Sequence, residues 1–531
     1  MPTKTKSSVS ILLALSCLAV SAFAQTVAPA APAAPAAAEE EASFTVTGFA
    51  VEGDSPLPED LTQSTLAPYV GVHHGIERLQ QAATALEGVL RERGFGFYRV
   101  VLPPQDIGGV IKLQMFKFTL GQVTVKGNKV FSDDNILRSL PQLTPGTSPN
   151  SYALARDLSL ANENPSKRAN VTFKQGDVAD TVDATVDVVD SKTLTGFLSL
   201  SNIGNAATGY NRLTAGLSHT NLFDRDQEGT VTYTTSPSDP GRVHQYGGYY
   251  RAPIYAWGGM VSAYYTRSSV DSGVVANAIN VTGRGEFAGI QYTKYFAPRG
   301  DYRSFLLLGL DDKNFINDKI TTLAGVPIFP NYRTRPLTLS YTGRSEKKWG
   351  LWGFNVDYAH NLDSGSGNDS TSYNANRLGA STGWDAVHFG ADLAVPLPAN
   401  WLFSGRMRGQ LSNDILVPGE QFGLGGAQSI RGLPERVISG DSGLQGNLEV
   451  WSPPVAENTR FLVFYDFGKI RNHNNPLLTS ATLTSVGAGV RWGLGSTWSA
   501  SLDFAHVLSG DANLPLGTSR DRAHFNLTWR Y

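Results

Sequence analysis

The chain of 531 residues contains one cysteine, few charged residues (17%) and a formal net charge of only −2. Cys17 lies in a segment that we interpret as a signal peptide, so we expect neither a disulfide nor a free thiol in the mature chain. A lipoprotein cysteine is the alternative, although Leu15 is one position out of place for that signal. The small net charge gives no indication of a nucleic-acid partner. Beyond the N-terminus no run of about 18 apolar residues occurs, so we expect no transmembrane helix.

Glycine and aromatic residues are abundant, with 55 glycines and an aromatic content of 10%. Many glycines and aromatic residues with few charges are typical of a β-rich protein that has a large apolar outer surface. A soluble helical enzyme fits this composition less well.

The N-terminus has the pattern of a secretory signal peptide over residues 1–24. Lys4 and Lys6 form its positive end, Val9 to Val20 is the apolar segment, and small residues precede a cleavage site after Ala24. The apolar segment is too short for a stable membrane anchor. Residues 25–43 are rich in alanine and proline, which predicts an extended linker.

Residues 44–117 read as a small α/β module in the order strand, helix, helix, strand, strand. The second helix is amphipathic because its apolar residues recur at spacings of three and four. The expected elements are a strand from Phe44, helices over Pro58–Pro68 and Gly75–Arg93, and strands over Phe95–Leu102 and Gly109–Phe118.

Residues 118–191 repeat this architecture without repeating the sequence. Ser132 is a favourable N-cap for the first helix of this second module, which we expect to run through Leu140. The other expected elements are a helix over Ser148–Asn162 and strands over Val123–Asn128, Val171–Lys174 and Thr181–Val189.

Residues 192–531 form roughly sixteen segments in which apolar and polar residues alternate, an even number typical of bacterial outer-membrane barrels. The clearest segment is the last, where Phe525, Leu527, Trp529 and Tyr531 alternate with polar residues. A strand with one face in lipid and one facing a polar lumen requires this period of two. Short and long connections also alternate, which places both modules on the periplasmic side. A soluble β-sandwich or propeller would leave the aromatic strand faces unexplained.

The longest polar gap between these segments holds the stretch Gln421–Leu433. Its four glycines, Gly423, Gly425, Gly426 and Gly432, permit tight turns and close approach of the backbone. Arg431 lies between Ile430 and Gly432, an arrangement suited to holding one guanidinium group in a fixed place. A flexible surface loop is the alternative interpretation.

Together these features resemble the TpsB family of two-partner secretion transporters, the ShlB/FhaC/HecB-type haemolysin secretion and activation proteins. Ile430, Arg431, Gly432 and Leu433 resemble the family's motif at the tip of the sixth outer loop, although Leu433 replaces an aromatic residue. The strand segment Phe464–Gly468 resembles a family motif with a lumen-facing aspartate. The resemblance implies that Arg431 pairs with Asp466 inside the barrel.

Further motifs carry the same resemblance. The turn Asn221–Gln227 is similar to a glycine-containing turn of the family, but Asp224 and Asp226 flank its arginine. The alternation that includes Phe525 and ends at Tyr531 resembles the signal that the outer-membrane assembly machinery recognises. The two modules resemble POTRA domains, which bind unfolded chains by adding a strand to a sheet edge.

The implied fold is a transmembrane β-barrel of about sixteen antiparallel strands preceded by two periplasmic α/β POTRA-like domains. The implied function is secretion of one partner protein through the outer membrane, the partner being a haemolysin, adhesin or toxin with an N-terminal secretion domain. The other expected contacts are outer-membrane lipid and, during biogenesis, the barrel assembly machinery. No cofactor or metal is expected. Some family members carry an N-terminal plug helix, but the prolines before Phe44 oppose one here.

Three other functions remain as alternatives. An insertase for outer-membrane proteins would share the barrel and the loop motif but usually has three or more periplasmic modules. A passive porin would not need the modules. An enzyme would need a catalytic constellation, and we identify none. His73 and His74 lack partners at metal-ligand spacing, so we expect them to form a solvent-exposed pair.

Overall fold

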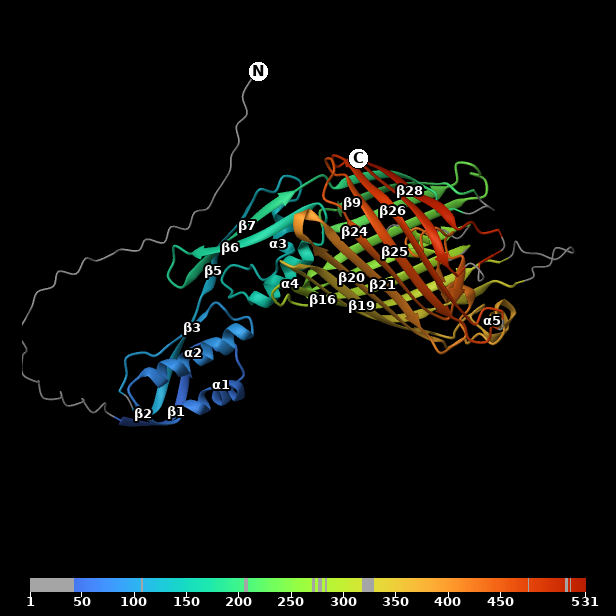
Figure 1. The fold of residues 1–531 in the computed structure, drawn as a ribbon. Helices are drawn as coiled ribbons and strands as arrows, with labels where there is room; N and C mark the ends of the chain where they lie inside the picture. Colours follow the sequence, from blue (N-terminus) through green and yellow to red (C-terminus); the bar gives the residue numbers. More distant parts are fainter. Residues whose placement is uncertain are drawn as a thin grey trace, which may run out of the picture.

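The computed structural model describes residues 43–531 except 107, 205–208, 270–272, 276–278, 282–283, 318–328, 476, 511–513 and 516. The predicted signal peptide, the linker up to residue 42 and Cys17 lie outside the described residues. The described chain forms two small α/β modules followed by a closed barrel, and both modules lie at one end of the barrel (Figure 1).

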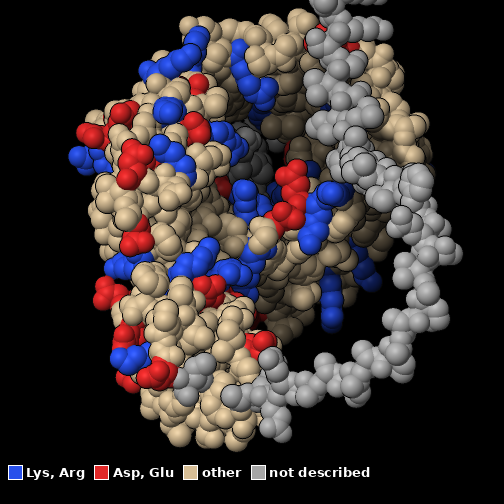
Figure 2. Space-filling view, turned by 90° about the vertical axis from the view of Figure 1, so that its left-hand side faces the viewer, with Lys and Arg blue, Asp and Glu red and all other residues tan. Residues whose placement is uncertain are grey.

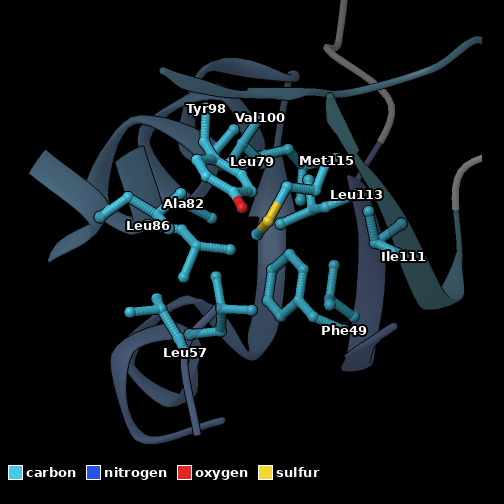
Figure 3. Packing of buried hydrophobic residues seen from close by; sticks show 14 residues of the cluster. Phe49, Leu57, Leu79, Ala82, Leu86, Tyr98, Val100, Ile111, Leu113 and Met115 are labelled. Carbon is cyan, nitrogen blue, oxygen red and sulfur yellow. The ribbon is translucent and has the colours of Figure 1, made fainter. Parts of the chain in front are cut away.

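Module 1, residues 43–117, is a four-stranded sheet with two helices on one face. Its elements are β1 (Ser43–Glu52), α1 (Glu59–Leu66), η1 (Ala67–Tyr69), β2 (Gly71–His74), α2 (Glu77–Glu92), β3 (Tyr98–Val101) and β4 (Gly109–Lys117). The strand order is β2-β1-β4-β3, with β1 and β4 parallel. Leu79, Ala82 and Leu86 on one stripe of α2 pack against Phe49 and Leu113 of the sheet (Figure 3). Burial of this apolar stripe gives the module a core of its own.

The short strand β2 between the two helices was not predicted, and it corrects the expectation for His73. Alternation along β2 turns His73 inward, where it is 2% exposed, whereas His74 remains exposed. The Nε2 atom of His73 lies 2.7 Å from the carbonyl oxygen of Tyr69, and its ring stacks on Phe44. The prediction of an exposed pair was therefore wrong for His73, because the apolar pattern of four residues is too short to reveal a strand.

Module 2 repeats this plan with three strands. Its elements are β5 (Thr119–Lys126), α3 (Asp133–Arg138), α4 (Ser151–Ala161), β6 (Lys167–Gln175) and β7 (Thr181–Asp190), and the strand order is β5-β7-β6. The Oγ atom of Ser132 accepts a hydrogen bond from the backbone N–H of Asn135 and so caps α3. Helix α4 begins after the predicted Ser148, because Asn150 caps it through the N–H groups of its first turn.

Sixteen antiparallel strands close the barrel within the described residues, with β17 and β18 forming one of them after a single-residue break. They are β8 (Leu194–Ser201), β9 (Arg212–Leu222), β10 (Gln227–Thr235), β11 (His244–Ile254), β12 (Gly259–Ser268), β15 (Gly285–Tyr295), β16 (Tyr302–Phe315), β17 (Tyr332–Thr334) with β18 (Pro336–Lys347), β19 (Gly350–Asn361), β20 (Asp385–Pro396), β21 (Leu402–Leu411), β24 (Ser442–Trp451), β25 (Arg460–Arg471), β26 (Ser480–Leu494), β27 (Trp498–Ser509) and β28 (Asp521–Arg530). The barrel closes where β28 pairs with β8.

Alternate residues of each strand face outward and inward, as the sequence pattern predicted. On β25, Phe461 and Val463 are exposed on the outer wall, whereas Phe464 and Asp466 are buried on the inner side. An apolar outer wall around a polar interior is what a strand between lipid and lumen requires, so the predicted fold class is confirmed. Among the helices of the described residues, none is long and apolar enough to cross a membrane.

The long connections lie at the end of the barrel opposite the modules, where α5 (Ser370–Asn376) belongs to the fifth of them (Figure 1). We number these outer loops in chain order, so that loop 5 joins β19 to β20, loop 6 joins β21 to β24 and loop 7 joins β25 to β26. Loop 6 contains a two-stranded hairpin of β22 (Phe422–Leu424) and β23 (Ile438–Gly440). β13 (Gly273–Val275) and β14 (Ile279–Val281) form a similar small hairpin in the third loop.

Module 2 sits against the periplasmic mouth of the barrel. The carboxylate of Glu163, just after α4, forms a 2.6 Å ion pair with Arg344 on β18. Leu160 at the end of α4 packs with Met260 and Tyr295 of the barrel wall. The mouth is hollowed beside the modules, and lysine, arginine, aspartate and glutamate side chains lie around the hollow (Figure 2).

Candidate functional site

Loop 6 folds into the barrel, and its tip is buried against the inner wall. Leu424, Ile430 and Leu433 are completely buried and pack against inward residues of three strands, among them Ile470 and Leu483. Leu433 thus packs in this apolar cluster, although the family motif has an aromatic residue at its position. The packing of the loop tip against the wall places the neighbouring Arg431 inside the lumen.

Arg431 at the tip of loop 6 is 3% exposed and uses its whole guanidinium group in contacts with the barrel wall. Its Nε and Nη2 atoms donate to the two carboxylate oxygens of Asp466 at 2.8 and 2.7 Å, and its Nη1 atom donates to Glu449 at 2.7 Å. The backbone N–H of Arg431 also donates to Asp466, at 3.1 Å. This bidentate geometry fixes the position of the guanidinium group as well as neutralising its charge.

The ring of Phe464 lies 3.4 Å from the guanidinium carbon of Arg431 and forms a cation–π contact. Asp503 on β27 lies 3.7 Å from Arg431 and also receives a bidentate pair from Arg491. Burial opposes the charge of Arg431, but Asp466, followed by Glu449 and Asp503, raises its pKa above the ordinary value. The guanidinium group therefore remains charged in the lumen.

Two glycines allow this close approach. Gly432 has a φ angle of +99°, a conformation that side chains rarely adopt, and a Cβ atom there would meet Val507 at 3.2 Å. A Cβ atom on Gly468 of β25 would come within 2.7 Å of Leu424. The loop lies directly on the strand because neither position carries a side chain.

Several residues of this site were not predicted. Asn447 on β24 donates to Asp466 at 2.8 Å and to the carbonyl oxygen of Ser429 at 2.7 Å, so it joins the aspartate to the loop. Glu449 lies on the same face of β24. The alternating polar residues Gln445, Asn447 and Glu449 are the sequence signal that could have indicated an inward polar face.

The remaining predicted residues lie away from this site. Phe525 is on β28, and Tyr531 follows that strand and pairs with the backbone of Gly196 on β8. The turn Asn221–Gln227 lies at the opposite end of the barrel from the outer loops and contacts module 2. Within the described part of the chain, no group of histidine, cysteine, aspartate and glutamate side chains is arranged to hold a metal ion.

Comparison with known proteins identifies the family. A sequence profile of the haemolysin secretion/activation proteins ShlB/FhaC/HecB matches residues 181–492, and a profile of the ShlB-type POTRA domain matches residues 44–117. The outer membrane transporter CdiB of Dickeya dadantii is 22% identical over 446 residues, which cover 80% of this chain and 77% of that protein. The heme/hemopexin transporter protein HuxB of Haemophilus influenzae is 21% identical over 506 residues, covering 89% and 85%.

The fold has a counterpart among solved structures. CdiB from Escherichia coli aligns with a TM-score of 0.74 at 19% sequence identity, covering 94% of this chain and 93% of CdiB. The ShlB/FhaC/HecB profile spans more than half of the 531 residues, from β7 through most of the barrel. The chain therefore belongs to the ShlB/FhaC/HecB family of haemolysin secretion/activation proteins.

Proposed function

We propose that this protein is an outer-membrane transporter that binds one unfolded partner protein in the periplasm and secretes it through its barrel. The observation that carries the proposal is loop 6, whose tip lies inside the lumen and is held there by Arg431. A partner chain can pass only when this loop moves, so the ion pair with Asp466 is a releasable closure. The family match favours secretion over the insertase alternative, and the proposal contains no enzymatic step.

We further propose that the partner first pairs with the edge of the module 2 sheet formed by β6. The side chain of Asn162 already satisfies the backbone N–H and C=O groups of Ala169, at 2.7 and 3.0 Å. By the alternation of an antiparallel strand, the backbone groups of Val171 and Phe173 point the same way. These groups have no strand beside them within the described residues. An extended partner segment can pair there through backbone hydrogen bonds whatever its sequence.

Three further assignments follow from the proposed secretion function: the class of the partner, the assembly signal and the lipid-facing surface. The partner is a haemolysin, adhesin or toxin with an N-terminal secretion domain, and it folds at the cell surface. Phe525 on the last strand and Tyr531 directly after it serve as the signal to the barrel assembly machinery. The exposed apolar residues of the outer wall, such as Leu308 and Val463, contact outer-membrane lipid.

Secretion by loop variants tests the proposal in intact cells that produce the partner. Arg431→Ala is expected to loosen the docked loop, because breaking one side of a secluded pair costs roughly 3–5 kcal/mol. Secretion should then fall strongly while the barrel still inserts, because the loop 6 tip no longer returns to its fixed place in the lumen between transport events. Heat-modifiable migration on gels measures insertion separately. Normal secretion by correctly inserted Arg431→Ala protein would remove loop 6 from the mechanism.

Strand pairing is tested with Phe173→Pro, which removes an outward N–H group from β6. Partner captured by the full-length protein is expected to fall several-fold. Val178→Pro, in the exposed turn after β6, is the matched control and is expected to leave capture unchanged. Equal capture by both variants would place the partner elsewhere on the modules.

A further inference from the structure

His524 on β28 contacts the loop 6 motif from the strand that closes the barrel. Its side chain is buried on the lumen side, 4% exposed, and its Nε2 atom lies 3.0 Å from the backbone nitrogen of Gly432. The backbone N–H of Gly432 donates this hydrogen bond, so Nε2 is the acceptor. Arg431 holds the tip to β24 and β25, and His524 holds the next residue to β28. The tip is therefore attached at two separate places on the wall.

The acceptor role fixes the protonation state of the imidazole. A ring nitrogen that accepts a hydrogen bond carries no proton, so the proton of neutral His524 is on Nδ1. The Nδ1 atom is buried and has no hydrogen-bond partner within the described residues. Protonation would give the ring a second N–H group. This group would be on Nε2 and would point directly at the N–H of Gly432. The hydrogen bond would then become a repulsive contact between two donors.

Gly432 depends on this acceptor because its own position is closed to water. The residue is buried, and its backbone is fixed at a φ angle of +99° against Val507 and Ala505. A buried N–H group without an acceptor is costly, so loss of the imidazole acceptor favours withdrawal of the tip into water.

Four charged groups act on His524 directly: Arg522 of its own strand, Asp503 of β27, Arg431 of loop 6 and Asp466 of β25. Three more charges lie one contact further away, since Glu449 of β24 pairs with Arg431, Arg491 of β26 pairs with Asp503, and Glu435 of loop 6 interacts with Arg522. Asp503 is the register partner of His524, but its carboxylate is already paired with Arg491 at 2.6 Å. Asp466 is likewise occupied by Arg431. A protonated His524 would therefore add a positive charge beside Arg431, where the nearby carboxylates of Asp466 and Asp503 are already paired with arginines.

We propose that His524 is a positioning residue that keeps the loop 6 tip docked in the lumen, and that it does so only while its imidazole is neutral. The inference rests on the proposed role of loop 6 as the closure of the pore. It adds a second attachment to that of Arg431, on a different strand, and makes the closure sensitive to acid.

Channel recordings on purified full-length protein in planar bilayers test this inference at neutral and acidic pH. His524→Gln keeps an acceptor oxygen near the position of Nε2 but cannot be protonated. His524→Ala removes the acceptor. His506→Gln on β27 is the matched control, since His506 is half-exposed and bonds to Asp521 rather than to loop 6.

The wild type and His506→Gln are expected to open more often on acidification than His524→Gln does. Glu435 is present in all of these proteins, so its own titration cancels in the comparison. His524→Ala is expected to be open roughly tenfold more often than the wild type at neutral pH, the order expected for one buried donor left without an acceptor. Should His524→Ala fail to fold, the acid response of the wild type against His524→Gln still decides the question.

The inference would be overturned if acid opened the wild type and His524→Gln equally. It would also be overturned if folded His524→Ala were open as rarely as the wild type at neutral pH. Arg431→Ala separates this result from the proposed function. If Arg431→Ala opens the channel and His524→Ala does not, loop 6 closes the pore without help from His524. If neither variant changes the channel and Arg431→Ala secretes normally, loop 6 does not close the pore.

Discussion

Lys167 on β6 and Asp226 in the first turn of the barrel form a 2.7 Å ion pair in which both side chains are almost fully buried. Asn135 accepts a second hydrogen bond from Lys167 at 2.9 Å, and the Tyr255 hydroxyl donates to Asp226 at 2.6 Å. Burial lowers the pKa of Lys167, and Asp226 offsets part of this effect. Module 2 is thus joined to the barrel by an ion pair that is shielded from water. The second pair between the two parts, Glu163 with Arg344, is more exposed.

Breaking one side of the buried pair should release module 2 from the barrel. Lys167→Met strands the carboxylate of Asp226, at a cost of about 3–5 kcal/mol, which corresponds to a hundredfold or larger rise in local opening. Amide hydrogen exchange of the turn Asn221–Gln227 measures this opening. The double variant Lys167→Met/Asp226→Leu should recover most of the protection, because it leaves no unpaired charge. Unchanged exchange in the single variant would show that other contacts hold the two parts together.

Arg377, just after α5, ties loop 5 to both ends of loop 6. Its guanidinium group donates to Asp441 at 2.7 Å and to the carbonyl oxygen of Leu416 at 2.6 Å, and Asp441 is completely buried. Arg377→Ala is therefore expected to loosen the outer loops by about 3–5 kcal/mol while the barrel strands stay protected.

Hydrogen exchange of residues 362–384 and 412–441 is the measurement for Arg377. Arg267→Ala is the matched control, because Arg267 on β12 pairs with Glu286 on β15 at 3.6 Å and both side chains are substantially exposed. Such a pair contributes at most about 1 kcal/mol. Equal effects of the two substitutions would mean that the pair with Asp441 has no special role in holding the outer loops.

The sequence was sufficient for the barrel but only partly for the site. Period-two alternation needs only neighbouring residues, so segments such as the one containing Phe464 could be assigned from the chain alone. The resemblance named Arg431 and Asp466, and these two residues are in contact. Asn447, Glu449 and His524 reach the same site from other strands. Their contacts depend on strand register and on how deeply loop 6 enters the lumen, which no local pattern contains.

The errors have a similar physical origin. β2 is only four residues long and pairs with β1 across an intervening helix, so it has too few positions for a pattern. His73 was consequently expected to be exposed. The hairpin of β22 and β23 was hidden by the glycines of loop 6, which indicate a turn but not the strands beside it.

Gly432→Ala should weaken docking of the loop 6 tip. The φ angle of +99° strains any residue with a Cβ atom, and the new methyl group would press on Val507 at 3.2 Å. We expect a cost of about 1–3 kcal/mol for the docked loop and hence a more frequently open channel in bilayer recordings. Gly495→Ala, in a periplasmic turn with open space around it and a φ angle of +56°, controls for the strain of a positive φ angle without a packing contact. If Gly432→Ala has no larger effect than Gly495→Ala, the close contact with Val507 plays no part in docking.

Glu435 gives the docked loop a pH dependence of the opposite sign to that of His524. Its carboxylate accepts a hydrogen bond from the backbone N–H of Ala427 at 2.9 Å, and burial raises its pKa from about 4.5 to about 7. The docked loop therefore binds the proton more tightly than the undocked loop does. Through this group, docking is strongest below about pH 4.5 and weakens as the pH rises to about 7.

A spin label at the exposed residue Gln428 reports this effect, because its mobility rises when the tip leaves the wall. In a His524→Gln background, label mobility should increase between about pH 5 and about pH 7, the interval that lies between the two pKa values of Glu435. Adding Glu435→Gln should abolish the increase and keep the label immobile at neutral pH, since a neutral amide needs no proton to remain buried. Glu457→Gln, in an exposed periplasmic turn, should leave the pH response intact. A response that persists in the Glu435→Gln protein would assign the titration to another group of the lumen.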